Sequence, residues 1–278
     1  MSLGGGVTSP EALLARAGLP PYPLTPLTGG DVARVFRAGP YVLKLHPNPP
    51  EGFFPAEARG LLALRNKGVR VPGVVHVEEE GLVLEYLPPG RPDWEGLARM
   101  LAHLHAQKEA LYGGERVYLG PFPLPGGFGE DWGRFFYEKR VLPLLEAARP
   151  GRLALEVERL PWARLPQEGP VLVHGDLWHG NVYFAQEGPA LLDPSAWVGE
   201  RGVDLAMMRL FGGFPEAFWR AYQALLPVPE EVWRALPCYQ VYFLLVHLLL
   251  FGRAYLEPLE RAVRGCREWK GTSGSSRP

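Results

Sequence analysis

Short apolar runs separated by turn residues fill the first 87 residues, whereas longer runs with helical spacing fill most of the remainder. Four of the short runs have the length and the β-branched or aromatic content of strands. These strands are predicted at 32–36, 41–45, 74–77 and 82–87. Apolar spacing also predicts a helix at 54–67. Thr8 and Glu11 have the spacing of a capping box, which would open a shorter helix ending at Ala17. The proline-rich segment 20–26 is predicted to be a linker.

Beyond the Pro88-Pro89-Gly90 break the pattern becomes mostly helical. Helices are predicted at 94–107, 131–148, 203–211, 215–225, 230–251 and 255–267. A Gly- and Pro-rich stretch at 113–129 is predicted to be a loop, and the small polar tail at 271–278 to be disordered.

The two patterns together predict an α+β fold with two lobes. A small β-rich lobe would take residues 1–87, and a larger, mainly helical lobe would take residues 88–270. A two-lobed layout places a ligand cleft at the junction of the lobes.

Composition narrows the class of protein. The 278 residues carry a net charge of −1, which argues against nucleic acid or an anionic membrane as a partner. The first residues lack the pattern of a signal peptide, and the apolar stretch 239–251 is too short to span a membrane. We therefore expect a cytoplasmic monomer. Cys238 and Cys266 form neither a disulfide framework nor a metal-binding spacing.

One polar loop, between two apolar runs, carries the candidate chemistry. Asp176 and Asn181 lie five residues apart, and Asp193 follows at the end of the next apolar run. Phosphoryl transfer needs one carboxylate to orient the attacking hydroxyl and accept its proton. It also needs an amide oxygen and a second carboxylate to hold Mg²⁺ on the nucleotide phosphates. The order and spacing predict that Asp176 is the base and that Asn181 and Asp193 are the Mg²⁺ ligands.

Two other interpretations of this loop stay open on the sequence. An aspartate in a loop is commonly a turn former or a helix cap. His174, Asp176 and His179 could alternatively bind a transition metal, although no further Cys or His ligands lie nearby in the sequence. We expect His174 to be structural and to hold the loop backbone by hydrogen bonds.

The first lobe offers residues for a nucleotide. Lys44 lies in an apolar strand, and Glu57 follows thirteen residues later in the next helix; this pairing would position the lysine on the phosphates. Alone, Lys44 could be an edge-strand lysine and Glu57 a charge that complements the helix dipole. The pair Gly29-Gly30 is a weak phosphate-loop signal. The backbone from Glu85 to Leu87 would form the hinge that binds the adenine edge.

The loop residues His174-Gly175-Asp176-Leu177-Trp178, with Gly180-Asn181, resemble those of the fructosamine kinase family, which is related to aminoglycoside phosphotransferases. Further similarity covers about residues 24 to 262. It includes Asp193-Pro194-Ser195-Ala196, Asp204-Leu205-Ala206, and Glu57 with its neighbours.

This resemblance implies a protein-kinase-like fold and an ATP-dependent kinase whose substrates are ketosamines, free or on lysine side chains. It implies that Lys44 contacts the α and β phosphates and that Asp204 braces the catalytic loop through its backbone. Trp178 would pack near the sugar or be a loop-core aromatic residue. His179 stands where the family usually has a small residue, and could alter the choice of substrate.

Two competing functions remain. One is a different small-molecule kinase of the same fold, acting on an aminoglycoside or a choline-like amine. The helices after Asp204 carry few acidic residues, which weakens the aminoglycoside version. The other is a non-catalytic nucleotide-binding module, which is disfavoured because the base, both metal ligands and the lysine are present.

Overall fold

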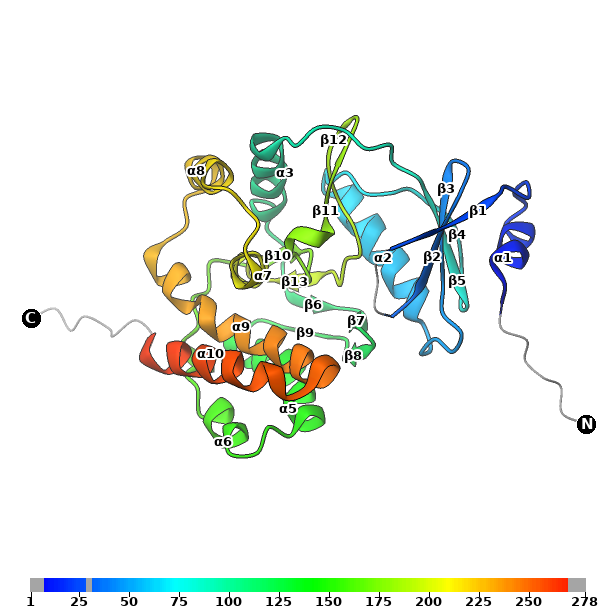
Figure 1. Cartoon of the computed structure of the whole chain (residues 1–278). Helices are drawn as coiled ribbons and strands as arrows, with labels where there is room; N and C mark the ends of the chain where they lie inside the picture. Colours follow the sequence, from blue (N-terminus) through cyan, green and yellow to red (C-terminus); the bar gives the residue numbers. More distant parts are fainter. Residues whose placement is uncertain (1–7, 29–31, 270–278) are drawn as a thin grey trace, which may run out of the picture.

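The computed structural model describes residues 8–28 and 32–269 and has a β-rich part and a helical part (Figure 1). The predicted α+β class is confirmed. The β-rich part is a five-stranded antiparallel sheet with the order β1-β2-β3-β5-β4. Its strands are β1 (Leu24–Leu27), β2 (Arg34–Ala38), β3 (Tyr41–Leu45), β4 (Val74–Glu78) and β5 (Gly81–Glu85). The proposed loop glycines Gly29 and Gly30, and the tail 271–278, lie outside the described residues.

One helix packs on each face of this sheet. Helix α1 (Pro10–Arg16) buries Leu13 and Leu14 against one face. Helix α2 (Phe53–Asn66) lies on the other face and continues into the main core of the molecule. The sheet is therefore covered on one side by a small helix and on the other by the helix that borders the cleft.

Two predictions in this part were wrong. The cap of α1 is the side chain of Ser9, which accepts a hydrogen bond from the backbone of Ala12 at 3.1 Å, so Thr8 is not the capping residue. Pro10 explains the shift, because proline favours the first helical position and leaves the preceding residue as the cap. The segment predicted as a linker contains most of β1. This edge strand tolerates Pro26 because one side of an edge needs no ladder hydrogen bonds.

The second part is built mainly from helices. They are α3 (Trp94–His105), α4 (Trp132–Phe136), α5 (Leu142–Ala148), α6 (Leu153–Glu158), α7 (Gly202–Phe211), α8 (Glu216–Leu225), α9 (Glu230–Phe251) and α10 (Leu256–Trp269). Helix α6 was missed in the sequence. The helix predicted at 131–148 is divided by a π-helical turn, η1 (Tyr137–Val141). Pro143, two residues after this turn, lacks the N–H that would continue a regular helix.

Short strands cross the helical part and flank the loop 174–181, which is called the catalytic loop below. They are β6 (Tyr112–Gly114), β7 (Val117–Leu119), β8 (Phe122–Leu124), β9 (Gly127–Gly129), β10 (Val171–Val173), β11 (Val182–Ala185), β12 (Gly188–Leu191) and β13 (Trp197–Gly199). Four of them form a sheet with the order β10-β13-β6-β9, and β11 pairs with β12 as a hairpin. The region 113–129, predicted as a loop, therefore contains four short strands in whole or in part. These strands could not be predicted from the sequence, because the glycines of this region interrupt the regular alternation of side chains.

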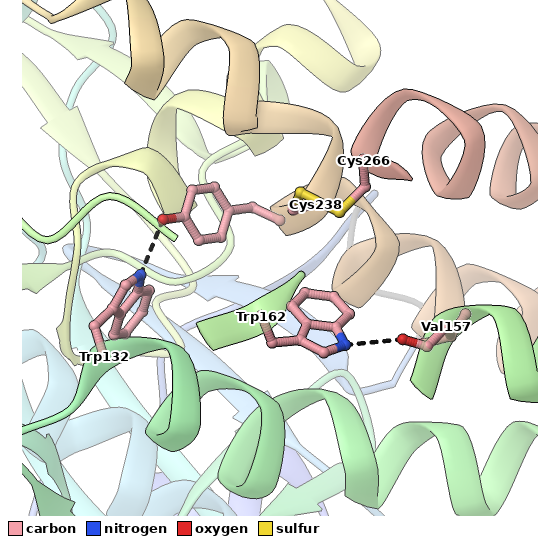
Figure 2. The surroundings of a disulfide bond; sticks show 6 residues. Trp132, Val157, Trp162, Cys238 and Cys266 are labelled. Atoms are coloured by element: carbon pink, nitrogen blue, oxygen red, sulfur yellow. Dashed lines mark hydrogen bonds between the residues drawn. A yellow bond between two sulfur atoms is a disulfide. The ribbon is translucent and has the colours of Figure 1, made fainter. Parts of the chain in front are cut away.

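A disulfide bond joins Cys238 of α9 to Cys266 of α10 (Figure 2). The expectation that the two cysteines form no disulfide was wrong. They are 28 residues apart, and only the packing of α10 along α9 brings them together. Both side chains are fully buried. The bond therefore ties the last helix to the long helix that forms one wall of the cleft.

Helices α9 and α10 form a continuous helical stretch, 230–269, with the length and apolar composition to cross a membrane; its most apolar window has a mean hydropathy of 1.7. That window is 56% buried inside the molecule. Core helices of globular proteins show the same combination of composition and burial.

Candidate active site

A cleft of ≈ 610 Å³ opens between the five-stranded sheet and the helical part. The residues singled out in the sequence that line it are Lys44, Glu57, Asp176, Trp178, His179, Asn181 and Asp193. They come from β3, α2, the loop after β10, and the residues after β12. Segments nearly 150 residues apart in the chain thus meet in one cavity.

Alternation along β3 sets the direction of Lys44. Leu43 and Leu45 are buried on the α1 face, so the lysine between them points to the opposite face, toward α2. Its Nζ lies 2.8 Å and 3.1 Å from the two carboxylate oxygens of Glu57, and it also contacts the carboxylate of Asp193. Burial alone would lower the pKa of Lys44, but the two carboxylates outweigh it and hold the pKa above its ordinary value. The lysine is therefore a permanent cation in the cleft.

The carboxylate of Asp193 is presented by unusual backbone geometry. This residue has a φ of 49°, in the left-handed region that residues other than glycine rarely adopt. Burial would raise the pKa of Asp193, but the charge of Lys44 outweighs this effect and lowers it, so the carboxylate stays ionised. The opposite holds for Glu57, where burial raises the pKa more than Lys44 lowers it, and the charge of Asp193 adds to the increase.

Hydrogen bonds from the backbone of the catalytic loop to the side chains of Asp204 and His174 hold this loop in place. The N–H groups of His174 and Gly175 donate to the two carboxylate oxygens of Asp204, at 2.9 Å and 3.0 Å. The ring of His174 accepts the N–H of Asp176 at Nδ1, at 3.1 Å, and its Nε2 donates to the carbonyl of Leu192 at 2.7 Å. One ring nitrogen is thus used within the loop and the other binds the segment that leads to Asp193, which is a structural role as expected for this histidine.

Close packing at the start of the loop requires glycine. Gly175 has a φ of 88°, and a Cβ atom there would lie 1.9 Å from the carbonyl oxygen of Ser195. The N–H of Ser195 in turn donates to the carbonyl of His174 at 2.9 Å. The catalytic loop and the segment after Asp193 therefore pack directly against each other, which restricts the distance between Asp176 and Asp193.

The carboxyl group of Asp176 lines the cleft but is largely buried from water. Burial raises the pKa of its carboxyl well above the ordinary value, and the charges of Asp193 and Asp204 raise it further. A raised pKa suits a group that must accept a proton during the reaction. The side-chain amide of Asn181 donates to the backbone carbonyl of Asp176 at 2.8 Å, which leaves its amide oxygen free to bind a cation.

The transition-metal alternative finds no support within residues 8–28 and 32–269, where no three His, Cys, Asp or Glu side chains form a metal-binding group. A magnesium site has different requirements. Mg²⁺ is commonly held by one or two protein oxygens, with nucleotide phosphates and water completing its octahedron. The amide oxygen of Asn181 and the carboxylate of Asp193 match this donor set.

Two aromatic side chains from the catalytic loop stand at the opening of the cleft. Trp178 is 38% exposed, and its ring centroid lies 4.9 Å from that of His179 in an edge-to-face arrangement. The imidazole of His179 packs against Gly213, where a Cβ atom would lie 2.8 Å from the ring. His179 therefore occupies cleft space that a small residue would leave open.

The opposite wall of the cleft is aromatic and apolar. Helices α7 and α9 and the residues after them contribute Met207, Phe211, Phe243, Val246, His247, Leu250, Phe251 and Tyr255. The imidazole of His247 donates from Nδ1 to the carbonyl of Phe243 at 2.7 Å, so only Nε2 remains for a ligand. Burial lowers the pKa of His247, so the ring is neutral at pH 7.

The hinge residues lie away from this cleft. Glu85 and Leu87 line a second cavity of ≈ 590 Å³, together with Val69, Arg70 and Val71. The carbonyl of Leu87 already accepts a hydrogen bond from the hydroxyl of Tyr183 at 2.7 Å. The contact of the hinge backbone with adenine stays a prediction.

A buried network of polar side chains behind the catalytic loop was not predicted from the sequence. His105 of α3 bonds to Asp204 at 2.9 Å and to the hydroxyl of Tyr222 at 2.9 Å. Arg201 donates to the same hydroxyl at 3.4 Å and forms a two-pronged ion pair with Glu168, at 2.9 Å in both bonds. The sequence signal for this network was the position of His105 on the apolar face of α3. The hydrophobic pattern alone indicates only that a residue at this position is buried.

Fold and site together define an ATP-dependent phosphotransferase with a protein-kinase-like architecture. Among solved structures, an ADP-bound aminoglycoside phosphotransferase, APH(2'')-Ib, has this fold. It superposes with a TM-score of 0.64 at 16% identity, over 94% of this chain and 98% of that one. A putative fructosamine-3-kinase from Thermobifida fusca matches with a TM-score of 0.85 at 29% identity, over 94% of this chain and 99% of that one.

The family model for fructosamine kinase matches residues 22–268. A probable ketoamine kinase of Thermus thermophilus is 62% identical over 257 residues, which cover 91% of this chain and 98% of the relative. One from Enterococcus faecium is 40% identical, over 83% of this chain and 90% of the relative. The chain belongs to the fructosamine kinase family.

Proposed function

We propose that the protein transfers the γ-phosphoryl group of ATP to a sugar hydroxyl of a ketosamine, an amine carrying a rearranged sugar, either free or on a lysine side chain. The observation that carries this proposal is the meeting of Asp176, Asp193 and Lys44 in one cleft whose other wall is aromatic. One side of the cleft can hold the phosphates, and the other can hold a sugar.

Each residue of the site has its own role in the proposed phosphoryl transfer. Lys44, fixed by Glu57, neutralises charge on the α and β phosphates. Asn181 and Asp193 would hold Mg²⁺, which when bound would offset the charge that develops on the phosphates. Asp176 orients the acceptor hydroxyl and takes its proton as the oxygen bonds to the γ-phosphorus and ADP departs. We propose that the hinge from Glu85 to Leu87 contacts the base.

The wall of the cleft formed by α7 and α9 favours an acceptor with few positive charges. The carboxylates that line the cleft are those of Glu57, Asp176 and Asp193, and all three are assigned to phosphate, metal or base. A polycationic aminoglycoside would find no additional carboxylate on the described wall of α7 and α9. The exposed faces of Trp178 and Phe251 offer surfaces on which a sugar ring can pack.

We also propose that the protein works in the cytoplasm, and that it works as a monomer because the residues assigned to the reaction all come from one chain. The test of the function is ATP turnover against a panel of acceptors: a fructosamine, a ribulosamine, an aminoglycoside, choline and free fructose. We expect turnover with the ketosamines at a kcat/KM at least a hundredfold above the other acceptors. Preferred turnover of an aminoglycoside or choline would assign the protein to the alternative small-molecule kinase.

A further inference from the structure

The start of helix α2 has no side-chain cap of its own. Its N-cap residue is Gly52, which has a φ of 75° and no side chain that could accept the free backbone N–H groups of the first turn. The N–H of Gly52 donates to the carboxylate of Glu79, in the turn between β4 and β5, at 2.9 Å. The same helix carries Glu57, whose carboxylate holds the amine of Lys44. Neighbouring elements therefore have to fix the end of α2 that lies closest to this ion pair.

Tyr118 of β7 reaches this helix end from the helical part. Strand β7 lies beside α2 (Figure 1). The hydroxyl of Tyr118 donates to the backbone carbonyl of Glu51 at 2.6 Å. Its ring meets the ring of Phe53 edge to face, with the centroids 5.4 Å apart. Because Tyr118 is buried, water competes little for this hydrogen bond. One side chain thus contacts both residues that flank the N-cap of α2.

This contact lies on the face of α2 that carries the functional glutamate. Phe53 and Glu57 are four residues apart in the helix, so their side chains project from the same face. Phe53, Glu57 and Tyr118 all line the cleft. Backbone hydrogen bonds between successive turns make the helix rigid over this distance. A displacement of the helix end at Phe53 would therefore be passed on to the carboxylate of Glu57.

A second link between the same two segments is weaker. Arg59 of α2 forms an ion pair with Glu115 and donates to the backbone carbonyl of Arg116 at 3.4 Å. The side chains of this ion pair are 46% and 72% exposed, and exposed ion pairs contribute little to stability. The hydrogen bond of Tyr118 is better shielded and lies nearer to the start of the helix. It is therefore the stronger candidate for holding α2 against the helical part.

We propose that Tyr118 is a positioning residue for phosphoryl transfer, which holds the start of α2 so that Glu57 keeps Lys44 directed at the phosphates. The inference rests on the roles proposed above for Glu57 and Lys44. The hydroxyl hydrogen of Tyr118 is engaged by the carbonyl of Glu51, so this side chain acts through α2 and not on the acceptor. Strand β7, which carries no group assigned to the reaction, thereby gains a role in it.

Tyr118→Phe tests this role, because it removes the hydroxyl and retains the ring against Phe53. MgATP affinity would be measured by titration calorimetry, which needs no acceptor, and the transfer rate by single-turnover phosphorylation of a ketosamine. We expect the substitution to weaken MgATP binding about threefold and to lower the rate about fivefold, because one hydrogen bond is lost and Lys44 is displaced slightly. In the Glu57→Ala background it should change either quantity by less than about 1.5-fold, since the link to Lys44 is already broken.

Tyr183→Phe is the matched control. The hydroxyl of Tyr183 also donates to a backbone carbonyl of the neighbouring part, that of Leu87, at 2.7 Å. This bond lies at the hinge and not at the start of α2. The factor by which Tyr183→Phe changes MgATP affinity should therefore be the same in the wild-type and Glu57→Ala backgrounds.

Equal losses from Tyr118→Phe in the two backgrounds, or no loss in either, would overturn the inference. So would a higher KM for the ketosamine with unchanged MgATP affinity, because the hydroxyl would then contact the acceptor. If the wild-type protein binds MgATP but phosphorylates no ketosamine, the proposed function fails, and the calorimetric comparison still decides the role of Tyr118. A wild-type protein that does not bind MgATP would contradict both.

Discussion

The imidazole of His105 lies 2.9 Å from the carboxylate of Asp204, although 99 residues separate them in the chain. The same carboxylate accepts the N–H groups of His174 and Gly175 at the start of the catalytic loop. Burial alone would raise the pKa of Asp204, but the hydrogen bond and charge of His105, with the loop N–H groups, lower it overall. His105 thus helps to keep the carboxylate of Asp204 ionised, and this carboxylate binds the backbone of the catalytic loop.

His105→Ala should leave the Asp204 carboxylate buried with one partner fewer. We expect a loss of about 3 kcal/mol in the free energy of unfolding, measured by chemical denaturation, because breaking a buried pair leaves an uncompensated charge. Tyr222→Phe removes the hydrogen bonds of its hydroxyl to His105 and Arg201 but leaves the bond between His105 and Asp204, and it should cost about 1 kcal/mol. Equal losses in the two variants would show that His105 does not act through Asp204.

The Lys44–Glu57 ion pair gives a second prediction. Glu57→Ala should lower the rate about ten- to hundredfold, because the lysine loses its fixed position on the phosphates. Lys44→Ala should cost at least as much, and the double variant no more than Lys44→Ala alone. Steady-state kinetics on all four proteins measures this. Additive losses would mean that the two residues work separately.

Those strands and helices that have a strong local pattern of apolar residues could be predicted from the sequence. The strand at 41–45 and the helix at 230–251 match the structure at both ends. Asp176, Asn181 and Asp193 could be chosen because their spacing along a single segment reflects the chemistry directly. Lys44 and Glu57 could be chosen because a strand and the following helix pack together in a predictable way.

The remaining features depend on tertiary packing, which leaves little local pattern. The contact of His105 with Asp204 requires α3 to pack near β10 and α7, and nothing near His105 in the sequence indicates this. The disulfide between Cys238 and Cys266 depends in the same way on the packing of two helices. The short strands at 113–129 form because neighbouring segments supply partners for glycine-rich backbone, not because their side chains alternate.

Stability should depend on pH through Glu200. This side chain is 3% exposed, and burial raises its pKa from 4.5 to about 7. Between these values the folded protein holds a proton that the unfolded chain releases. The stability linked to this proton is therefore full below pH 4.5 and is lost as the pH rises through about 7.

Glu200→Gln retains an oxygen to accept the backbone N–H groups of Glu168 and Gly169 but carries no titrating proton. We expect this variant to be more stable than wild type by about 2–3 kcal/mol at pH 8 and equally stable near pH 4.5. Denaturant unfolding across this range measures the difference. Parallel stability curves for the two proteins would rule out titration of Glu200 in this window.

The α9–α10 disulfide should contribute mainly to stability. Replacing both Cys238 and Cys266 by Ala should cost about 3–4 kcal/mol, as expected from cross-linking a loop of 28 residues in the unfolded chain. The rate per folded molecule should change less than twofold at moderate temperature, since neither sulfur lines the cleft. Thiol titration under denaturing conditions, with and without reductant, establishes whether the bond is present. Two free thiols in the unreduced protein would contradict the structure.

The most direct test of the proposed mechanism is single-turnover phosphorylation of a ketosamine by wild type and by Asp176→Asn, with MgATP affinity measured in parallel. The substitution keeps the shape of the side chain and removes its ability to accept a proton. We predict that the rate falls by about three orders of magnitude or more while MgATP affinity changes less than threefold, because Asp176 acts on the acceptor hydroxyl. A variant that phosphorylates the ketosamine at a rate near that of wild type would contradict the assignment of Asp176 as the base.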